Sequence, residues 1–419
     1  VATLDEMLLI TFSRAASQEL RERVRRAVLD TLHALDHPDD PPRNDVVRHI
    51  VDGSAAELTA RRERLRDALA RFDGATIATT HQFCHLVLRS LGVAGDTDAG
   101  VTLVESLDDL VTEIVDDLYL AHFGAAPGEP VLTRKDALRL AREVVRNPHA
   151  QLRPADPAPG SEPAVRVTFA EDVLRQLDQR KRRLGILSYD DLLSRLADAL
   201  RTPDSPARAR MYQRWSIVMV DEFQDTDPVQ WQVIDRAFSG RSTVILIGDP
   251  KQAIYGFRGG DIVTYLDAAR GAADRRTLSV NWRSDRALVD CLHVVLGGAE
   301  LGDPDIKVRD VSAHHESRRL AGAPHGEPFR LRVVGRDTFG TRQGSTIPIA
   351  KLRRHICADL AADVATLLGS DATFDGAPVQ ARDIAVIVEL HDDARRCHEA
   401  LADAGIPSVY TGDSDVYRS

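Results

Sequence analysis

The chain has 419 residues and a formal net charge of −10 at pH 7, with 43% hydrophobic and 28% charged residues. A chain of this length holds about two to four domains, and its composition is typical of a soluble globular protein. The acidic balance argues against nucleic-acid binding through overall charge, but it leaves room for a local basic track.

No apolar run approaches the roughly 20 residues that a membrane helix needs, and the N-terminus lacks the basic start of a signal peptide. The four cysteines form no Cys-x-x-Cys pair, which suits reduced thiols. His81, Cys84 and His85 lie close together in the sequence, but no second cluster would close a tetrahedral metal site. We therefore expect a cytoplasmic protein with no membrane segment.

The first predicted strand, Met7–Phe12, runs into a polar cluster that ends at Arg14. A helix is predicted from Ala15 to about Leu35, because apolar residues recur there at helical spacing. The arginines further along this helix are expected to be solvated and partly paired with neighbouring glutamates.

A second predicted strand, Ala75–Thr79, leads into Thr80, His81 and Gln82. Hydroxyl, imidazole and amide groups at the end of a strand can hydrogen-bond phosphates. The alternative is that His81 caps the helix that follows.

The next part of the chain carries fewer signals. Helices are predicted at Leu107–Phe123 and Arg134–Arg146, and residues 151–164 have the composition of a proline-rich linker. Ser188–Leu193 then precedes the most informative stretch.

Two short apolar runs, Ile217–Val220 and Val244–Ile247, read as buried strands on either side of a helix at Pro228–Phe238. This pattern is typical of a parallel sheet that is covered on both faces. Ligands bind such sheets at the carboxyl ends of the strands. The first run stops at Asp221 and Glu222.

An acidic pair at a strand end suits a nucleotide–magnesium site. One carboxylate can hold Mg²⁺, and its neighbour can orient the attacking water. The alternative is that the pair caps the next helix. A second polar cluster, beyond the next strand, favours the site: Asp249 and Gln252 are followed by Tyr255, Phe257 and Arg258 in a glycine-containing loop.

Further on, a strand is predicted at Arg276–Val280 and is followed by Trp282 and Arg283. A tryptophan offers a large flat face, and a guanidinium binds phosphate through two hydrogen bonds. The alternative for Trp282 is core packing. Near the end of the chain we predict strands at Ile384–Val388 and Ile406–Tyr410, with a helix between them.

The stretches VDEFQDTDPVQ and IGDPKQAIYGFRGGDI resemble motifs II and III of superfamily 1 helicases of the UvrD/Rep type. The chain looks most similar to the RecB-type motor subunit of bacterial recombination nuclease-helicases. The resemblance implies an α/β fold, a RecA-like motor domain with a parallel sheet and a helical insertion, plus the first part of a second RecA-like domain. It places the first motor domain in residues 1–91 and 185–276, the helical accessory domain in 92–184 and the partial second motor domain in 277–419.

The resemblance also implies roles for individual residues. The catalytic residues would be Asp221, Glu222, Gln252 and Arg283, with Asp221 holding Mg²⁺. Nucleotide binding would fall to Asp249, Gln252, Trp282 and Arg283. DNA binding would fall to Thr11, Phe12, Arg14, Thr80, His81, Gln82, Tyr255, Phe257 and Arg258.

The implied function is ATP-driven 3′→5′ DNA translocation and unwinding in recombination repair, with ATP and Mg²⁺ as cofactors. Single-stranded DNA, duplex ends and the partner subunits of a RecBCD- or AddAB-like complex would be the partners. The phosphate-binding pattern G-x-x-x-x-G-K-[ST] does not occur in the sequence, and motifs V and VI are not recognised. We therefore expect a fragment that does not hydrolyse ATP alone. The alternatives are a DNA-binding module without turnover and an unrelated phosphohydrolase that uses only the acidic pair.

Overall fold

The computed structural model describes residues 2–40, 44–91, 102–104, 106–125, 128–147, 151–254, 256, 260–340 and 346–410. It divides into two compact units, Val1–Ala273 and Asp274–Ser419.

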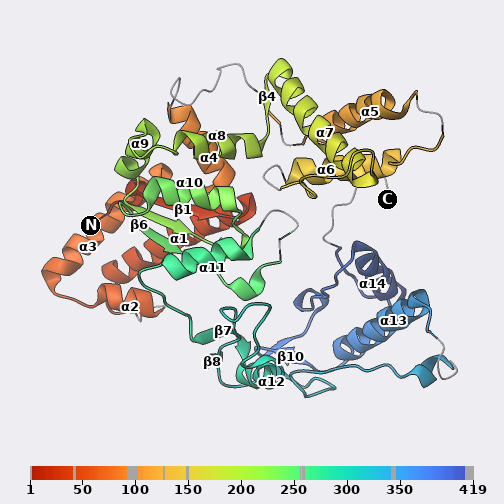
Figure 1. The fold of residues 1–419 in the computed structure, drawn as a ribbon. Coiled ribbons are helices and arrows are strands. Elements are labelled where there is room, and N and C mark those ends of the chain that lie inside the picture. Colours follow the sequence, from red (N-terminus) through yellow and green to blue (C-terminus); the bar gives the residue numbers. More distant parts are fainter. Residues whose placement is uncertain are drawn as a thin grey trace. The chain divides into compact units, whose positions relative to one another are not determined.

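The first unit is built on a parallel sheet of four strands in the order β2-β1-β5-β6. Figure 1 labels β1 and β6 of this sheet. The strands are β1 (Met7–Thr11), β2 (Thr76–Thr79), β5 (Ile217–Val220) and β6 (Thr243–Leu246). Ile10 lies opposite Ala78 on one side and Val220 on the other, and Val220 lies opposite Leu246. This register aligns the carboxyl ends of all four strands, and it confirms the predicted α/β fold with a parallel sheet.

Successive side chains of the strands point to opposite faces, and each face is covered by different helices. Leu8, Ile10 and Val218 belong to the main hydrophobic core, which Phe83 and Phe238 share with the buried ring of Trp215. The helices on this side are α4 (Thr80–Leu91), α8 (Tyr189–Ala199), α9 (Pro206–Arg214) and α10 (Pro228–Phe238).

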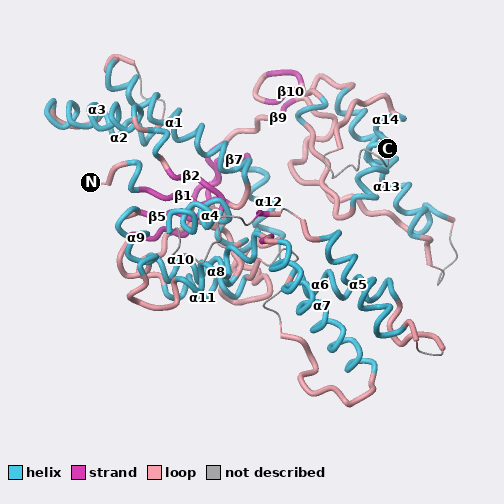
Figure 2. Tube along the Cα trace, turned by 90° about the horizontal axis from the view of Figure 1, so that it is seen from above, coloured by secondary structure: helices cyan, strands magenta, loops and turns pink. Residues whose placement is uncertain are grey.

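Helix α1 (Arg14–Asp36) covers the other face of the sheet, where its Leu20 and Val24 pack near Leu9 and Ile77. Figure 2 shows the strands in magenta, with β1, β2 and β5 side by side. The edge strand β6 departs from the prediction of a buried strand, because Ile245 is 41% exposed. Among the described residues, β6 pairs only with β5.

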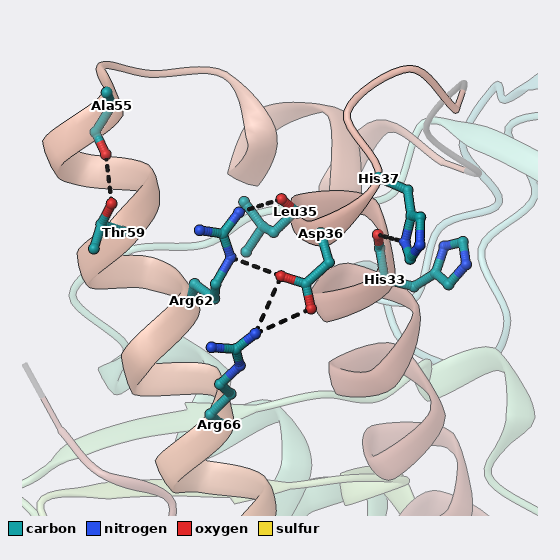
Figure 3. A network of polar contacts seen from close by, with 8 residues as sticks. All are labelled: His33, Leu35, Asp36, His37, Ala55, Thr59, Arg62 and Arg66. Atoms are coloured by element: carbon teal, nitrogen blue, oxygen red, sulfur yellow. Dashed lines mark hydrogen bonds and ion pairs between the residues drawn. The ribbon is translucent and has the colours of Figure 1, made fainter.

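Helix α1 is joined to α3 (Ala55–Ala70) by a polar network, and α2 (Asp45–Val51) lies between them in the chain. The carboxylate of Asp36 forms ion pairs with Arg62 Nε at 2.8 Å and Arg66 Nη2 at 3.2 Å (Figure 3). Arg62 also donates to the carbonyl of Leu35. These contacts hold the end of α1 against the side of α3.

The predicted helices in the middle of the chain are confirmed as α5 (Asp108–Phe123) and α6 (Arg134–Arg146), which pack with α7 (Glu162–Leu184) around their own core. Two short strands flank these helices, β3 (Thr102–Leu103) and β4 (Ile186–Leu187), and they pair in parallel. None of the helices in the described ranges has both the length and the apolar character needed to cross a bilayer.

A partly buried ion pair ties the end of α7 to the start of α8. Lys181 Nζ donates to both carboxylate oxygens of Asp191, at 2.6 and 2.8 Å, and the two side chains are 14% and 25% exposed. Asp191 also accepts from the backbone N and the hydroxyl of Ser188, both at 2.8 Å. Burial alone would raise the pKa of Asp191, but the hydrogen bonds from Lys181 and Ser188 outweigh it and lower that pKa.

We expect Lys181→Ala to weaken the connection between α7 and α8, because the change leaves the partly buried carboxylate of Asp191 without its cation. The cost is about 3 kcal/mol, which corresponds to roughly a hundred-fold faster amide hydrogen exchange in α8. Because the pKa of Asp191 is lowered in the fold, the effect is full above the ordinary carboxyl pKa and fades as the pH falls through the folded value. Exchange measured on the full-length protein, with the exposed Lys135→Ala as control, tests this, and equal exchange in α8 would contradict it.

The second unit contains a parallel pair of strands and a small antiparallel sheet. The parallel pair is β7 (Val280–Asp285) and β8 (Ser312–His315), and the antiparallel sheet is β9 (Leu320–Ala321), β10 (Thr373–Phe374) and β11 (Ala377–Pro378). The helices are α12 (Arg286–Leu296), α13 (Ile349–Leu368) and α14 (His391–Asp403). Short 3-10 helices in the chain occupy Leu4–Glu6, Phe72–Gly74, Phe223–Asp225, Pro250–Gln252, Arg336–Phe339 and Ala381–Asp383.

Three strand predictions fail in this unit. Residues 384–388 and 406–410 form no strand in the structure, and Ile387 and Val409 are 94% and 89% exposed. An apolar run becomes a strand only where another strand pairs its backbone groups, and no described segment does so here. The strand predicted at Arg276–Val280 instead begins at Val280, so Trp282 and Arg283 lie within it.

Candidate active site

Several of the polar side chains predicted from the sequence lie at the carboxyl ends of the strands of the parallel sheet in the first unit. Thr11 ends β1 and lies opposite Thr79, which ends β2, while Asp221 follows β5. The sheet order places Asp221 and the residues after β6 in one half of these strand ends and the two threonines in the other.

The acidic pair is held by the backbone at the end of β5. The backbone N of Asp221 donates to the carbonyl of Ile10 at 2.9 Å, and Asp221 Oδ1 accepts from the backbone N of Glu222 at 3.1 Å. Glu222 has a φ of 53°, in the left-handed region that residues other than glycine rarely adopt. Such a conformation costs about 1–3 kcal/mol and is often found at functional sites.

Glu222 occupies the N-cap position of the 3-10 helix Phe223–Asp225, but its side chain makes no capping hydrogen bond there. The acidic pair does not cap helix α10 either. The N-cap of α10 is Asp227, whose carboxylate accepts from the backbone N of Val229 at 2.8 Å and of Gln230 at 2.9 Å. Glu222 remains exposed to solvent. Neither carboxylate of the acidic pair therefore accepts a capping hydrogen bond from a following helix.

Gln224 links the two strand ends, and the sequence analysis missed it. Its Nε2 donates to Glu222 Oε2 at 2.7 Å, and its Oε1 accepts from the backbone N of Asp249 at 3.0 Å. The residue is only 2% exposed. The sequence offered one signal for Gln224, namely a polar residue two positions after the acidic pair. Its hydrogen bond with Asp249 joins residues 25 positions apart, so only the folded structure shows it.

Beyond β6, the carboxylate of Asp249 forms hydrogen bonds with two side chains at the start of the predicted loop. It accepts from Lys251 Nζ at 2.7 Å and from Gln252 Nε2 at 3.1 Å. Burial would raise the pKa of Asp249, but the hydrogen bonds from Lys251 and Gln252 outweigh it and lower that pKa. Asp249 is thus anionic at neutral pH and fixes the side chain of Gln252.

The same loop returns to helix α11 (Ile262–Gly271), which is anchored to the acidic segment. The backbone N of Asp261 donates to the carbonyl of Thr226 at 3.3 Å. Tyr265 donates its hydroxyl to the carbonyl of Gly248 at 3.3 Å, and its ring lies 5.8 Å from that of Phe223. Tyr255, Phe257 and Arg258, to which DNA binding is assigned, lie outside the described residues.

Asp225 is a second residue that sequence reasoning missed. It is 7% exposed, and within the described structure its Oδ1 has no hydrogen-bond partner. Burial, together with the charge of Glu222, raises the pKa of Asp225. The ionised form of Asp225 is therefore disfavoured relative to that of a free carboxyl group.

The donor chemistry of the strand ends fits Mg²⁺. Asp221 and Glu222 offer carboxylate oxygens, and one oxygen of Asp221 is already oriented by the backbone N of Glu222. In the part of the chain that is described, no group of three or more His, Cys, Asp or Glu residues could hold a metal ion. The fit to Mg²⁺ rests on the two carboxylates alone, since proteins bind Mg²⁺ through one or two carboxylates together with substrate phosphates.

At the end of β1, Thr11 and its neighbours differ in exposure. Thr11 is 2% exposed, and its hydroxyl donates to the carbonyl of Ser13 at 3.2 Å and contacts the Ser17 hydroxyl. Phe12 is 36% exposed and Arg14 is exposed. The side chains of Phe12 and Arg14 are thus accessible to a ligand, whereas that of Thr11 supports the turn into α1.

At the end of β2, Thr79 and Gln82 cap helix α4. Gln82 Oε1 accepts from the backbone N of Thr79 at 2.9 Å, and the backbone N of Gln82 donates to the hydroxyl of Thr79 at 3.3 Å. Thr80 is 8% exposed. Burial lowers the pKa of His81, against the opposing charges of Asp190 and Asp227. Thr79 and Gln82 thus form reciprocal cap contacts at the start of α4.

In the second unit, Trp282 is 61% exposed, so the alternative of core packing is wrong. One face of its ring stacks on His314, with ring centroids 3.8 Å apart. The backbone of Arg283 is fixed, because its N donates to Asn281 Oδ1 at 2.9 Å and its carbonyl accepts from Arg319 Nη2 at 2.6 Å. The guanidinium of Arg283 is exposed on this fixed strand.

A parallel sheet with an acidic pair and an amide network at adjacent strand ends is typical of an α/β nucleotide-binding protein. The family model for the UvrD/REP helicase N-terminal domain matches residues 2–272. The chain belongs to this helicase family.

The relatives of this chain include RecB subunits of the RecBCD enzyme. The chain is 68% identical to that of Mycolicibacterium smegmatis and 63% identical to that of Mycobacterium tuberculosis, over its whole length in both cases. It is 31% identical to that of Escherichia coli over 58% of its length. The chain spans 38% of the length of the two mycobacterial relatives and 21% of that of the third.

Proposed function

We propose that this chain forms part of an ATP-driven 3′→5′ DNA translocase and helicase that acts in double-strand-break repair. The observation that carries the proposal is the network at the carboxyl ends of β5 and β6, where Glu222, Gln224, Asp249 and Gln252 are joined by hydrogen bonds. DNA and further subunits of a RecBCD- or AddAB-like complex are its partners, and the cytoplasm is its location.

In this proposal the residues assigned to the nucleotide have separate tasks during hydrolysis. Asp221 holds Mg²⁺, which neutralises charge on the phosphates when it is bound. Glu222 orients the attacking water and accepts its proton. Gln252, fixed by Asp249, contacts the γ-phosphate, and Trp282 and Arg283 bind the adenine and the γ-phosphate.

Strand displacement by the full-length protein tests the helicase function. We expect ATP-dependent unwinding of duplexes with a 3′ single-stranded tail, and much slower unwinding of the same duplex with a 5′ tail. Equal rates on both tails, or separation of strands without ATP, would contradict the proposed polarity and energy source.

We expect Tyr255→Ala and Phe257→Ala to weaken single-strand binding in the absence of nucleotide. If each ring stacks on a base, each change costs about 1–3 kcal/mol in binding free energy, or roughly 5- to 150-fold in Kd. The measurement is a fluorescence titration of the full-length protein with a single-stranded oligonucleotide. Unchanged affinity in both variants would remove these rings from the DNA site, and Phe329→Ala in the second unit is an exposed-phenylalanine control.

A further inference from the structure

The side-chain amide of Gln224 forms hydrogen bonds through both its NH₂ group and its oxygen. Its NH₂ group donates to the carboxylate of Glu222 at 2.7 Å, and its oxygen accepts from the backbone N of Asp249 at 3.0 Å. Because the residue is 2% exposed, water competes little for either bond. A single rigid amide thus spans the ends of β5 and β6.

Close packing at Gly248 fixes the position of this amide. A Cβ atom at Gly248 would lie 2.7 Å from Gln224 Oε1, and 3.1 and 3.2 Å from the backbone N atoms of Phe223 and Gln224. Only glycine allows the end of β6 to approach so closely. The backbone at Gly248 is therefore packed directly against the amide of Gln224.

The network continues from Asp249 into the loop. Its carboxylate holds Gln252 Nε2 at 3.1 Å, so hydrogen bonds connect Glu222, Gln224, Asp249 and Gln252 in sequence. At the other end, Glu222 is exposed and has a left-handed backbone, and among the hydrogen bonds of the described residues its carboxylate accepts only the one from Gln224. The direction of this carboxylate thus depends on Gln224.

We propose that Gln224 is a positioning residue that couples the carboxylate of Glu222 to the Asp249–Gln252 segment. The proposal rests on the proposed ATPase function. When the loop after β6 shifts, the backbone N of Asp249 moves the amide oxygen of Gln224, and the amide NH₂ then moves the carboxylate. Gln224 itself contacts neither the water nor the phosphates.

The test is Gln224→Glu in the full-length protein. The new carboxylate cannot donate to Glu222 and repels it, so the acid is turned away from its working position. Because a displacement of about 1 Å can cost 10²-fold, we expect kcat for DNA-stimulated ATP hydrolysis to fall about 10²-fold with little change in KM for ATP. Two adjacent carboxylates share a proton as the pH falls, which restores a donor between them. The deficit relative to wild type should therefore shrink at lower pH.

The exposed Gln232→Glu on helix α10 introduces the same charge and is the matched control, with kcat expected to stay at the wild-type value. Gly248→Ala is a second variant, because its Cβ pushes on Gln224 without any change of charge. It should lower kcat and reduce the stimulation by DNA, with no recovery at low pH.

Wild-type kcat in Gln224→Glu would overturn the inference. So would a loss that is independent of pH and matched by a lower Tm, since that is the behaviour of a structural residue. If Gln224→Glu does not fold, normal kcat in Gly248→Ala overturns it as well. Absence of DNA-stimulated turnover in the wild-type protein would overturn the proposed function, and this inference with it, before any variant is compared.

Discussion

Glu222→Gln in the full-length protein should abolish most ATP turnover while leaving ATP binding intact. The amide has the shape of the carboxylate and can still accept the hydrogen bond from Gln224 through its oxygen. It cannot accept a proton from the attacking water, and loss of general-base catalysis lowers kcat by about 10²–10⁴-fold. The measurement is steady-state ATP hydrolysis with saturating single-stranded DNA, beside a titration with a fluorescent ATP analogue.

The exposed Glu171→Gln in helix α7 is a matched control for this change and should hydrolyse ATP at the wild-type rate. Turnover of Glu222→Gln within a few-fold of wild type would remove Glu222 from the reaction. Loss of nucleotide binding along with turnover would instead assign the residue to the binding of the metal or the phosphates.

Arg283→Ala should lower kcat by about 10³-fold, because a guanidinium that contacts the γ-phosphate stabilises the charge of the transition state. The backbone contacts of Arg283 with Asn281 and Arg319 do not involve its side chain, so the strand should keep its structure. Arg283→Lys keeps the charge but loses the planar fork, and it should recover only part of the rate.

A pre-steady-state measurement of phosphate release by the full-length protein checks this prediction. The exposed Arg309→Ala in the same unit is the control, and its rate should not change. Equal rates for Arg283→Ala and the control would contradict contact with the γ-phosphate. A raised KM for ATP with unchanged kcat would show that the arginine contributes only to binding.

The sheet of the first unit could be predicted because each strand leaves a local signal. Ile217–Val220 is apolar and stops at an acid, and Pro228 after Asp227 marks the start of a helix. The exposure of β6 could not be predicted, since it depends on which strands lie beside it. The failed strands at residues 384–388 and 406–410 have the same cause, because an apolar run does not reveal its pairing partner.

The residues of the candidate site that follow a strand could be predicted from the sequence, whereas the contacts between strands could not. Asp221, Glu222 and Gln252 stand at predicted strand ends or just after them, so their neighbourhood followed from the rule for parallel sheets. Gln224 could not be found in this way, because its hydrogen bond to Asp249 joins two strands that are adjacent only in the fold. The left-handed backbone of Glu222 is likewise a property of the folded turn.

In the proposed function, the residues at the ends of β5 and β6 hydrolyse ATP in response to DNA. The measurement that tests it most directly is ATP hydrolysis by the full-length protein with and without single-stranded DNA, for wild type and Glu222→Gln. The account predicts that DNA strongly stimulates the wild-type rate and that the variant stays near background in both conditions. A wild-type protein that binds DNA but shows no DNA-dependent turnover would contradict the claim and favour a DNA-binding module.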